Sequence, residues 1–302
     1  MSGSVLTVGT FDGVHRGHQA VAAEVVRRAR AGGRRSVLVT FDPHPLEVVN
    51  PAAAPRLLTL ADERAALLAA LGLDQVAVLP FTPALSHLAP DEFVRRVLRA
   101  QFGMEELVLG YDHGFGRGRA GDLATMRELG GADGFGVDVV EPVRDDGQPI
   151  SSTLIRAAVA HGRLAQAARW LGRSYTTRGT VVAGAGRGRG IGVPTINLAP
   201  PDPRKLLPPD GVYAVWVGIE GRGNGEGGRV GGMMNQGPRP TFGDATRTLE
   251  VHLFDFAADV YGATVTVEWV ERLRDVRTFV SREALVAQLG RDREAARASL
   301  NL

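Results

Sequence analysis

The sequence predicts an α/β domain with a parallel sheet, followed by a small antiparallel β-barrel that ends in a helix. The length of 302 residues suits two domains, since one domain typically holds about 100 to 200 residues. The first half alternates short apolar runs with amphipathic stretches, as in a parallel sheet covered by helices on both faces. The second half consists of short β-rich segments separated by glycines, which is typical of a barrel.

The predicted elements follow this division at residue 173. In the first domain we expect strands over 4–9, 36–41, 75–81, 106–112 and 134–143. Between and after them we expect helices over 17–33, 60–72, 90–103, 121–130, 151–162 and 163–172. In the second domain we expect strands over 176–184, 211–219, 229–237, 247–256 and 263–273, and a final helix over 281–300.

Composition excludes several kinds of chemistry. The chain has no Cys, which rules out disulfides, thiolate metal sites and a cysteine nucleophile. Its single Lys, Lys205, lies in a Pro-rich stretch, which argues against a Walker-type phosphate loop and against Schiff-base catalysis. There is no apolar run of membrane-spanning length and no signal-peptide pattern, so we expect a cytoplasmic protein without a membrane partner.

The charge pattern does not indicate nucleic acid. The net charge is +2, and 33 acidic residues are interspersed among 35 basic ones. A nucleic-acid binder is expected to cluster its positive charge in a patch or stripe. We therefore expect small-molecule partners and no nucleic acid, and the sequence leaves open whether the chain forms a homo-oligomer.

A motif with phosphate-binding chemistry follows the first predicted strand. Residues 9–18 read GTFDGVHRGH and lead into a helix, and ligands bind at the carboxyl ends of such strands. His15 and His18 share one helix face beside the N-terminal N–H groups, and Gly17 would let a phosphate approach the backbone. We expect the imidazoles to donate hydrogen bonds to a phosphate chain. Metal ligation and a structural role are the alternatives.

A second, hydroxyl-rich motif opens a later helix. Ser151, Ser152 and Thr153 precede an apolar helical stretch with Arg156 in its first turns. A plain N-cap would explain one of these hydroxyls. Because an Arg at a helix start opposes the helix dipole unless an anion compensates, the group also suits a triphosphate. The residues alone leave both interpretations open.

The second half contains a Gly-rich stretch, GTVVAGAGRGRGIGVPTIN, over residues 179–197. Glycines such as Gly184 and Gly190 let backbone amides surround phosphate oxygens without a lysine. Thr195 and Asn197 are two residues apart, so in extended backbone they face one side. Their neutral oxygens suit magnesium that is already held by nucleotide phosphates. A solvated loop is the alternative.

One strand of the second half offers a general base. Residues 249–256, LEVHLFDF, alternate, so Glu250 shares its face with His252 and Phe254. Partly apolar surroundings would raise the pKa of the Glu250 carboxyl and let it deprotonate a hydroxyl. A solvated strand residue is the alternative.

These motifs together resemble those of bacterial bifunctional FAD synthetases. The first half resembles an HxGH nucleotidyltransferase in TFDGVHRGH at 10–18, TFDPHP at 40–45, GYDHGFGRGRAGD at 110–122 and SSTLIR at 151–156. The second half resembles a riboflavin kinase in PTIN at 194–197, DGVY at 210–213, NQGPRPTF at 235–242 and Glu250. The resemblance implies a Rossmann-like FMN adenylyltransferase domain over 1–173 and a β-barrel riboflavin kinase domain over 174–302.

The resemblance also implies two reactions and their residues. ATP phosphorylates riboflavin to FMN, and a second ATP adenylylates FMN to FAD with release of pyrophosphate. In the first half, His15 and His18 are expected to be catalytic, and contacts to ATP or flavin are expected from Gly9, Phe11, His15, His18, Asp112, Phe115, Ser152, Thr153 and Arg156. In the second half, Glu250 is expected to deprotonate riboflavin, with magnesium on Thr195 and Asn197, and nucleotide or flavin contacts from Gly184, Gly190, Thr195 and Arg274.

Three alternatives to this bifunctional enzyme are considered. The chain has His113 and Gly114 where the family usually has an aromatic, so a riboflavin kinase with a weak or altered adenylyltransferase half is the first. A GxGxxG match at Gly116, Gly118 and Gly121 suggests a nicotinamide oxidoreductase, although it follows the fourth strand and a dinucleotide fingerprint follows the first. The third is a regulatory flavin-binding protein, which would need neither magnesium nor a general base.

Overall fold

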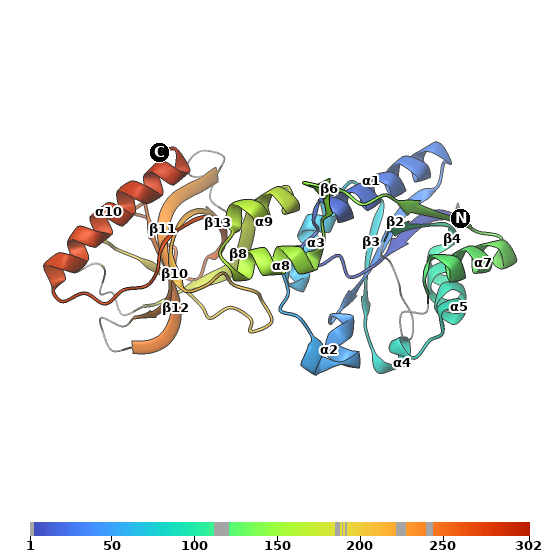
Figure 1. Cartoon of the computed structure of the whole chain (residues 1–302), viewed down its shortest axis with the longest axis horizontal. Coiled ribbons are helices and arrows are strands. Elements are labelled where there is room, and N and C mark those ends of the chain that lie inside the picture. The colour runs from blue at the N-terminus through green and yellow to red at the C-terminus, as the bar shows by residue number, and fades with distance from the viewer. Residues whose placement is uncertain are drawn as a thin grey trace. The chain divides into compact units, whose positions relative to one another are not determined.

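The computed structural model describes residues 3–111, 121–184, 188, 190, 192–221, 228–239 and 244–302. The chain forms two compact units, Met1–Leu154 and Ile155–Leu302 (Figure 1). The division by contacts therefore falls earlier than residue 173, and the sequence-based boundary stays a prediction.

The first unit is built on a parallel sheet of five strands in the order β3-β2-β1-β4-β5. The predicted strands are all present, as β1 (Ser4–Val8), β2 (Arg35–Asp42), β3 (Gln75–Pro80), β4 (Met104–Gly110) and β5 (Gly136–Val140). Strand β1 lies in the middle, with Val5 paired to Ser36 on one side and to Glu106 on the other. The strand order reverses beside β1, and in open α/β sheets ligands bind at such a point, outside the carboxyl ends of the strands.

The helices of this unit connect its strands. They are α1 (Arg16–Ala31), α2 (Pro45–Val49), η1 (Pro51–Ala53), α3 (Ala61–Ala69), α4 (Pro83–Ser86), α5 (Pro90–Phe93), η2 (Val94–Arg99), α6 (Ala100–Phe102) and α7 (Leu123–Asp133). A hairpin of β6 (Arg144–Asp145) and β7 (Gln148–Pro149) follows. The predicted helix over 90–103 is continuous with a π-type turn in its middle, at η2. The short helices α2 and α4 and the hairpin were not predicted, because so few residues carry no periodicity.

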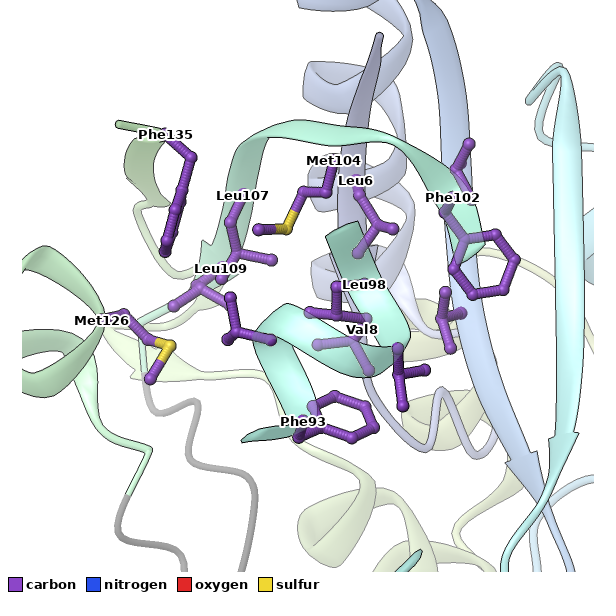
Figure 2. Close-up of a cluster of buried hydrophobic side chains, with 14 of the residues drawn as sticks. Leu6, Val8, Phe93, Leu98, Phe102, Met104, Leu107, Leu109, Met126 and Phe135 are labelled. Carbon is purple, nitrogen blue, oxygen red and sulfur yellow. The ribbon is translucent and has the colours of Figure 1, made fainter. Parts of the chain in front are cut away.

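Both faces of this sheet are covered, as the alternation predicts. Val5 and Val108 pack against Val21, Val25 and Ala29 on the α1 side. The opposite face packs against the helical segment from α5 to α6, and Figure 2 shows this cluster, which includes Leu6, Val8, Leu107 and Leu109 from the strands and Phe93, Leu98 and Phe102 from the helices. The two layers hold β1 rigidly, and its carboxyl end carries the first motif.

Replacing Leu98 should destabilise the first unit strongly. The Leu98 side chain is fully buried in the cluster of Figure 2. Leu98→Ala removes apolar contacts and leaves a cavity, so we expect a loss of about 2–5 kcal/mol in the free energy of unfolding. Calorimetry of the purified chain measures this loss. Leu46→Ala is the control, because Leu46 is 36% exposed in the same unit. Equal effects of the two substitutions would contradict the assignment of this core.

The second unit is a closed antiparallel barrel in the order β10-β11-β12-β9-β8-β13. Its strands are β8 (Tyr175–Val182), β9 (Ile196–Leu198), β10 (Gly211–Ile219), β11 (Arg229–Arg239), β12 (Asp244–Leu253) and β13 (Thr264–Arg274). Strand β9 was not predicted as a strand. It pairs with β12 on one side and with β8 on the other, so three residues close the barrel.

Helices α8 (Ser152–Ala160), α9 (Leu164–Leu171) and α10 (Arg282–Leu300) complete the chain. Helix α10 begins at the N-cap Ser281, whose hydroxyl accepts a hydrogen bond from the Ala284 amide at 3.1 Å. It packs on the outer face of the barrel, where Ala296 and Leu300 join Ala214, Met233 and Phe254. Across the described part of the chain, no helix has the length and apolar character needed to span a bilayer.

Candidate functional site

The turn that follows β1 has an unusual backbone. Phe11, Gly13 and Val14 have φ values of 48°, 83° and 42°. Left-handed backbone at a bulky residue costs about 1–3 kcal/mol and persists only where the surrounding structure fixes it. Here the fixing contacts are those of burial, because Phe11 and Val14 are 4% and 1% exposed and pack with Ala22, Leu38 and Leu68. The turn is therefore held in one shape before any ligand binds.

Asp12 is the polar anchor of this turn, and the sequence did not point to it. It is fully buried, and its carboxylate accepts hydrogen bonds from the Leu58 amide at 3.0 Å, the Thr59 amide at 2.9 Å and the Thr59 hydroxyl at 3.1 Å. The Gly13 amide donates to the same hydroxyl at 2.9 Å. Nothing in the sequence links Asp12 to a segment so far along the chain.

Asp12→Asn should destabilise the first unit. An amide in place of the carboxylate turns a donor toward the Leu58 or Thr59 amide, and each buried donor left unpaired costs about 1–3 kcal/mol. We expect a lower thermal midpoint, measured by calorimetry. Asp146→Asn is the matched control, because Asp146 is an exposed turn residue of the same unit, also with positive φ. An unchanged midpoint for Asp12→Asn would contradict the anchoring role.

His15 and His18 lie together at the start of α1. His15 is the N-cap, and its Nδ1 accepts from the His18 amide at 3.4 Å. The two rings are stacked with centroids 3.6 Å apart, and Phe11 meets His18 edge-on at 5.1 Å. Since Nδ1 of His15 accepts, the proton of its neutral ring is on Nε2, which is then a donor. The predicted face of two imidazoles at a helix N-terminus is thus present.

Glycines shape this turn in a way that the sequence did not predict. A Cβ on Gly17 would lie 3.1 Å from the His15 ring, so Gly17 makes room for that imidazole. A Cβ on Gly9 would lie 3.3 Å from the Phe11 ring. The expected approach of a phosphate to Gly17 stays a prediction.

Ser152 joins the two motifs of the first half. Its hydroxyl donates to the Asp12 carbonyl oxygen at 2.9 Å, across 140 positions of sequence. The Ser151 hydroxyl accepts from the Leu154 amide at 3.3 Å, which is the capping role that the sequence left open. Thr153 is exposed, and Arg156 is half-buried one turn further along α8. Asp112 and Phe115 lie outside the described residues, as do His113 and Gly114.

In the barrel, Glu250 lies in a row of polar side chains across three strands. It pairs with Asn197 of β9 on one side and with Asn235 of β11 on the other. Directly opposite residues of antiparallel strands point to the same face, so the carboxylate stands between two carboxamides. The sequence proposed Glu250 and Asn197 separately and did not propose Asn235 as a site residue.

Two of the described glycines of the Gly-rich segment lie close to residues of this segment's end. A Cβ on Gly184 would lie 2.0 Å from the Asn197 amide nitrogen, so a side chain there would displace the Asn197 carboxamide. A Cβ on Gly188 would lie 2.2 Å from the Val193 carbonyl oxygen and 3.5 Å from the Thr195 hydroxyl. Gly190 is exposed, and its carbonyl accepts a hydrogen bond from Arg282 of α10. The strand register thus brings Asn197 and Glu250 together, and Thr195 lies two residues before Asn197 in the chain.

Arg274 is tied to helix α10. Its Nε lies 2.9 Å from Asp292 Oδ1 and its Nη2 lies 2.6 Å from Asp292 Oδ2, and the two side chains are only 12% and 3% exposed. Its Nη1 donates to the Asp275 carbonyl at 2.8 Å, and the guanidinium carbon lies 5.8 Å from the centre of the Phe279 ring. The side chain is therefore oriented by the protein itself.

The described residues contain no cluster of three or more His, Asp or Glu side chains arranged to hold a metal. The oxygen-bearing side chains that strand register places opposite each other here are those of Asn197 and Glu250, and the hydroxyl of Thr195 precedes Asn197 by two residues. Such hard oxygen donors fit Mg²⁺, which usually keeps several waters and takes one or two protein ligands beside substrate phosphates.

Comparisons with known proteins cover both halves of the chain. A family model for FAD synthetase matches residues 1–154, and one for riboflavin kinase matches residues 171–300. Relatives named bifunctional riboflavin kinase/FMN adenylyltransferase occur in Pseudomonas fluorescens, at 40% identity over 98% of this chain and 93% of the relative, and in Bacillus subtilis, at 34% identity over 97% and 91%. A crystal structure from Streptococcus pneumoniae, described as a macrolide-efflux protein, is similar over 98% of this chain and 94% of its own, with a TM-score of 0.86 and 34% identity.

Proposed function

The chain belongs to the family of bifunctional riboflavin kinases/FMN adenylyltransferases, and from this premise we propose which of its residues carry out the two reactions. It is a transferase with both activities, and its substrates are riboflavin, FMN and ATP. The function restricted to a riboflavin kinase is not favoured, because the first half matches FAD synthetase and the relatives carry both activities in their names.

For adenylyl transfer, the proposal rests on the bond between Ser152 and the Asp12 carbonyl, which draws the SSTLIR motif to the turn of the HxGH motif. The FMN phosphate attacks the α-phosphorus of ATP, and pyrophosphate leaves. His15 donates from Nε2, and His18 donates beside it, to the phosphate oxygens on which charge grows. Preorganised donors stabilise such charge more than water does. Thr153 and Arg156 bind the same phosphates.

For kinase chemistry, the proposal rests on the direct pairing of Glu250 with Asn197, whose side chain lies beside Gly184. The 5′-hydroxyl of riboflavin gives its proton to the Glu250 carboxylate as the hydroxyl oxygen attacks the γ-phosphorus of ATP, and ADP leaves. Positioning and electrostatic stabilisation supply most of the rate in phosphoryl transfer. Asn235 flanks Glu250 and helps to orient its carboxylate.

We propose Mg²⁺ as the metal of the kinase site, held by Thr195 and Asn197. When bound there, it would neutralise charge on the ATP phosphates. Gly184 and Gly190 bind ATP through the backbone, and Arg274, fixed by Asp292, faces the flavin. Contacts of Gly9, Phe11, Asp112 and Phe115 with ATP or flavin stay predictions, and so does the cytoplasmic location.

Incubation of the purified chain with riboflavin, ATP and MgCl₂, with FMN and FAD separated by chromatography, tests both reactions. We expect FMN first and then FAD. A second reaction, supplied with FMN in place of riboflavin, tests the first half alone. If no FAD forms in either reaction although FMN is present, adenylyl transfer is contradicted. If no FMN forms from riboflavin, the kinase activity is contradicted.

A further inference from the structure

His252 is enclosed between the Gly-rich segment and helix α10. Its side chain is 7% exposed, and it shares a strand face with Glu250, two residues away. Its Nδ1 lies 2.7 Å from the Pro194 carbonyl oxygen, and its Nε2 lies 3.0 Å from Nη2 of Arg293. The imidazole therefore bridges α10 and the residue that immediately precedes Thr195.

The two partners determine the protonation of this ring. A carbonyl oxygen only accepts, so Nδ1 of His252 carries the proton, and a guanidinium only donates, so Nε2 is unprotonated. Burial and the charge of Arg293 lower the pKa of His252, while the Pro194 carbonyl and Asp255 raise it, and the net shift is downward. The Phe254 ring, edge-on at 5.8 Å, limits rotation of the imidazole. The bridge is thus a neutral ring in one tautomer.

Helix α10 also contacts the other side of the same segment. Arg282 donates to the Gly190 carbonyl, and Val193 packs against the apolar cluster that includes Ala296 and Leu300 of the helix. Gly190 is thereby bonded to α10 directly, and Pro194 is connected to α10 through His252. Of these contacts, the one at Pro194 lies immediately before Thr195 and three residues before Asn197.

We propose that His252, oriented by Arg293, is a positioning residue of the kinase site. It fixes the Pro194 carbonyl, so that Thr195 and Asn197 meet MgATP in one geometry. The inference rests on the proposed function of Thr195 and Asn197, and His252 itself takes no part in proton transfer. If Thr195 and Asn197 are held in the binding geometry beforehand, MgATP binds without the entropy cost of ordering them. We therefore expect the bridge to affect the affinity for MgATP more than the turnover at saturating MgATP.

Steady-state riboflavin kinase assays over a range of MgATP test this role. His252→Leu keeps the volume of the side chain but removes the donor to Pro194. We expect it to raise KM for MgATP by about tenfold, the value of one hydrogen bond, while kcat changes by less than about threefold. His252→Asn places an amide donor near the position of Nδ1, so we expect its KM to return to within about threefold of the unsubstituted chain. An unchanged KM in a folded His252→Leu chain overturns the proposal.

Substitutions on α10 give a second test that leaves His252 in place. Arg293→Met removes the donor to Nε2, and we expect KM for MgATP to rise in the same direction. Arg297→Met is the matched control, since Arg297 lies one turn further along α10 and pairs with Asp255 at 2.9 Å. We expect Arg297→Met to leave KM unchanged, and equal shifts in the two variants overturn the specific role of Arg293.

Two further measurements separate this proposal from others. Calorimetry of each variant reports whether its barrel is folded, and a rise in KM that appears only with loss of the folded barrel overturns a positioning effect. FAD formation from FMN by the first half should be unchanged in every variant. Asn197→Ala tests the proposed function itself. If Asn197→Ala leaves the Mg²⁺ dependence of the kinase unchanged, the proposed metal site is wrong. If instead Asn197→Ala changes that dependence but His252→Leu leaves KM for MgATP unchanged, only the positioning role of His252 is wrong.

Discussion

Glu250→Gln is expected to lower the rate of FMN formation by about 10²- to 10⁴-fold, the contribution typical of a general base. The amide matches the carboxylate in size and can still meet Asn197 and Asn235 across the strands. It cannot take the proton of the riboflavin hydroxyl. Kinase turnover at saturating riboflavin and MgATP measures the loss, and quenching of flavin fluorescence checks that riboflavin still binds.

Two controls accompany this substitution. FAD formation from added FMN should be unchanged, because the first half performs that reaction. Glu271→Gln is the matched variant, since Glu271 is an exposed carboxylate on strand β13 of the same barrel, bonded to Ser299 at 2.6 Å. Retention of more than about a tenth of the kinase rate in Glu250→Gln would be outside the range for a general base and would remove that assignment.

His15→Asn should lower FAD formation from FMN by about 10²- to 10³-fold, as the loss of one preorganised donor does in other enzymes. Asn is among the best N-cap residues, so it can replace Nδ1 of His15 as acceptor for the His18 amide and keep α1 intact. The substitution therefore removes the imidazole donor without removing the cap. Turnover at saturating FMN and MgATP is the measurement.

The design separates catalysis from folding. FMN formation from riboflavin should not change, and calorimetry should show a thermal midpoint near that of the unsubstituted chain. His87→Asn is the control, because His87 is an exposed histidine of the same unit. Unaltered FAD formation in His15→Asn would show that His15 is a helix cap alone, which is the structural alternative left open by the sequence.

The elements were predictable where periodicity runs over many residues. Helix α1 and strand β2 follow their apolar patterns to within a few residues. Strand β9 was missed because its three residues, Ile196–Leu198, carry no period of their own and are a strand only through their neighbours β8 and β12. The π-type turn at η2 was missed for the same reason, since it departs from the regular helix without interrupting the apolar pattern.

For the candidate sites, the sequence supplied residue types and the structure supplied partners. His15 and His18 were predictable as a pair because three positions of helix fix their spacing. The anchoring of Asp12 by Leu58 and Thr59 was not, because no local pattern links segments so distant along the chain. Arg274 was proposed as a flavin contact, and its bidentate bond to Asp292 became visible only when α10 packed beside the barrel.

By itself, the sequence determined the two classes of domain, the order of most elements and the residues able to bind phosphate or take a proton. Tertiary structure alone decided that Glu250 faces Asn197 and Asn235, that Ser152 reaches Asp12, and that α10 contacts the Gly-rich segment. The physical reason is the distance along the sequence over which each interaction acts. Periodicity and capping act between residues a few positions apart, whereas strand register and the closure of a barrel are set by burying apolar faces from distant segments together.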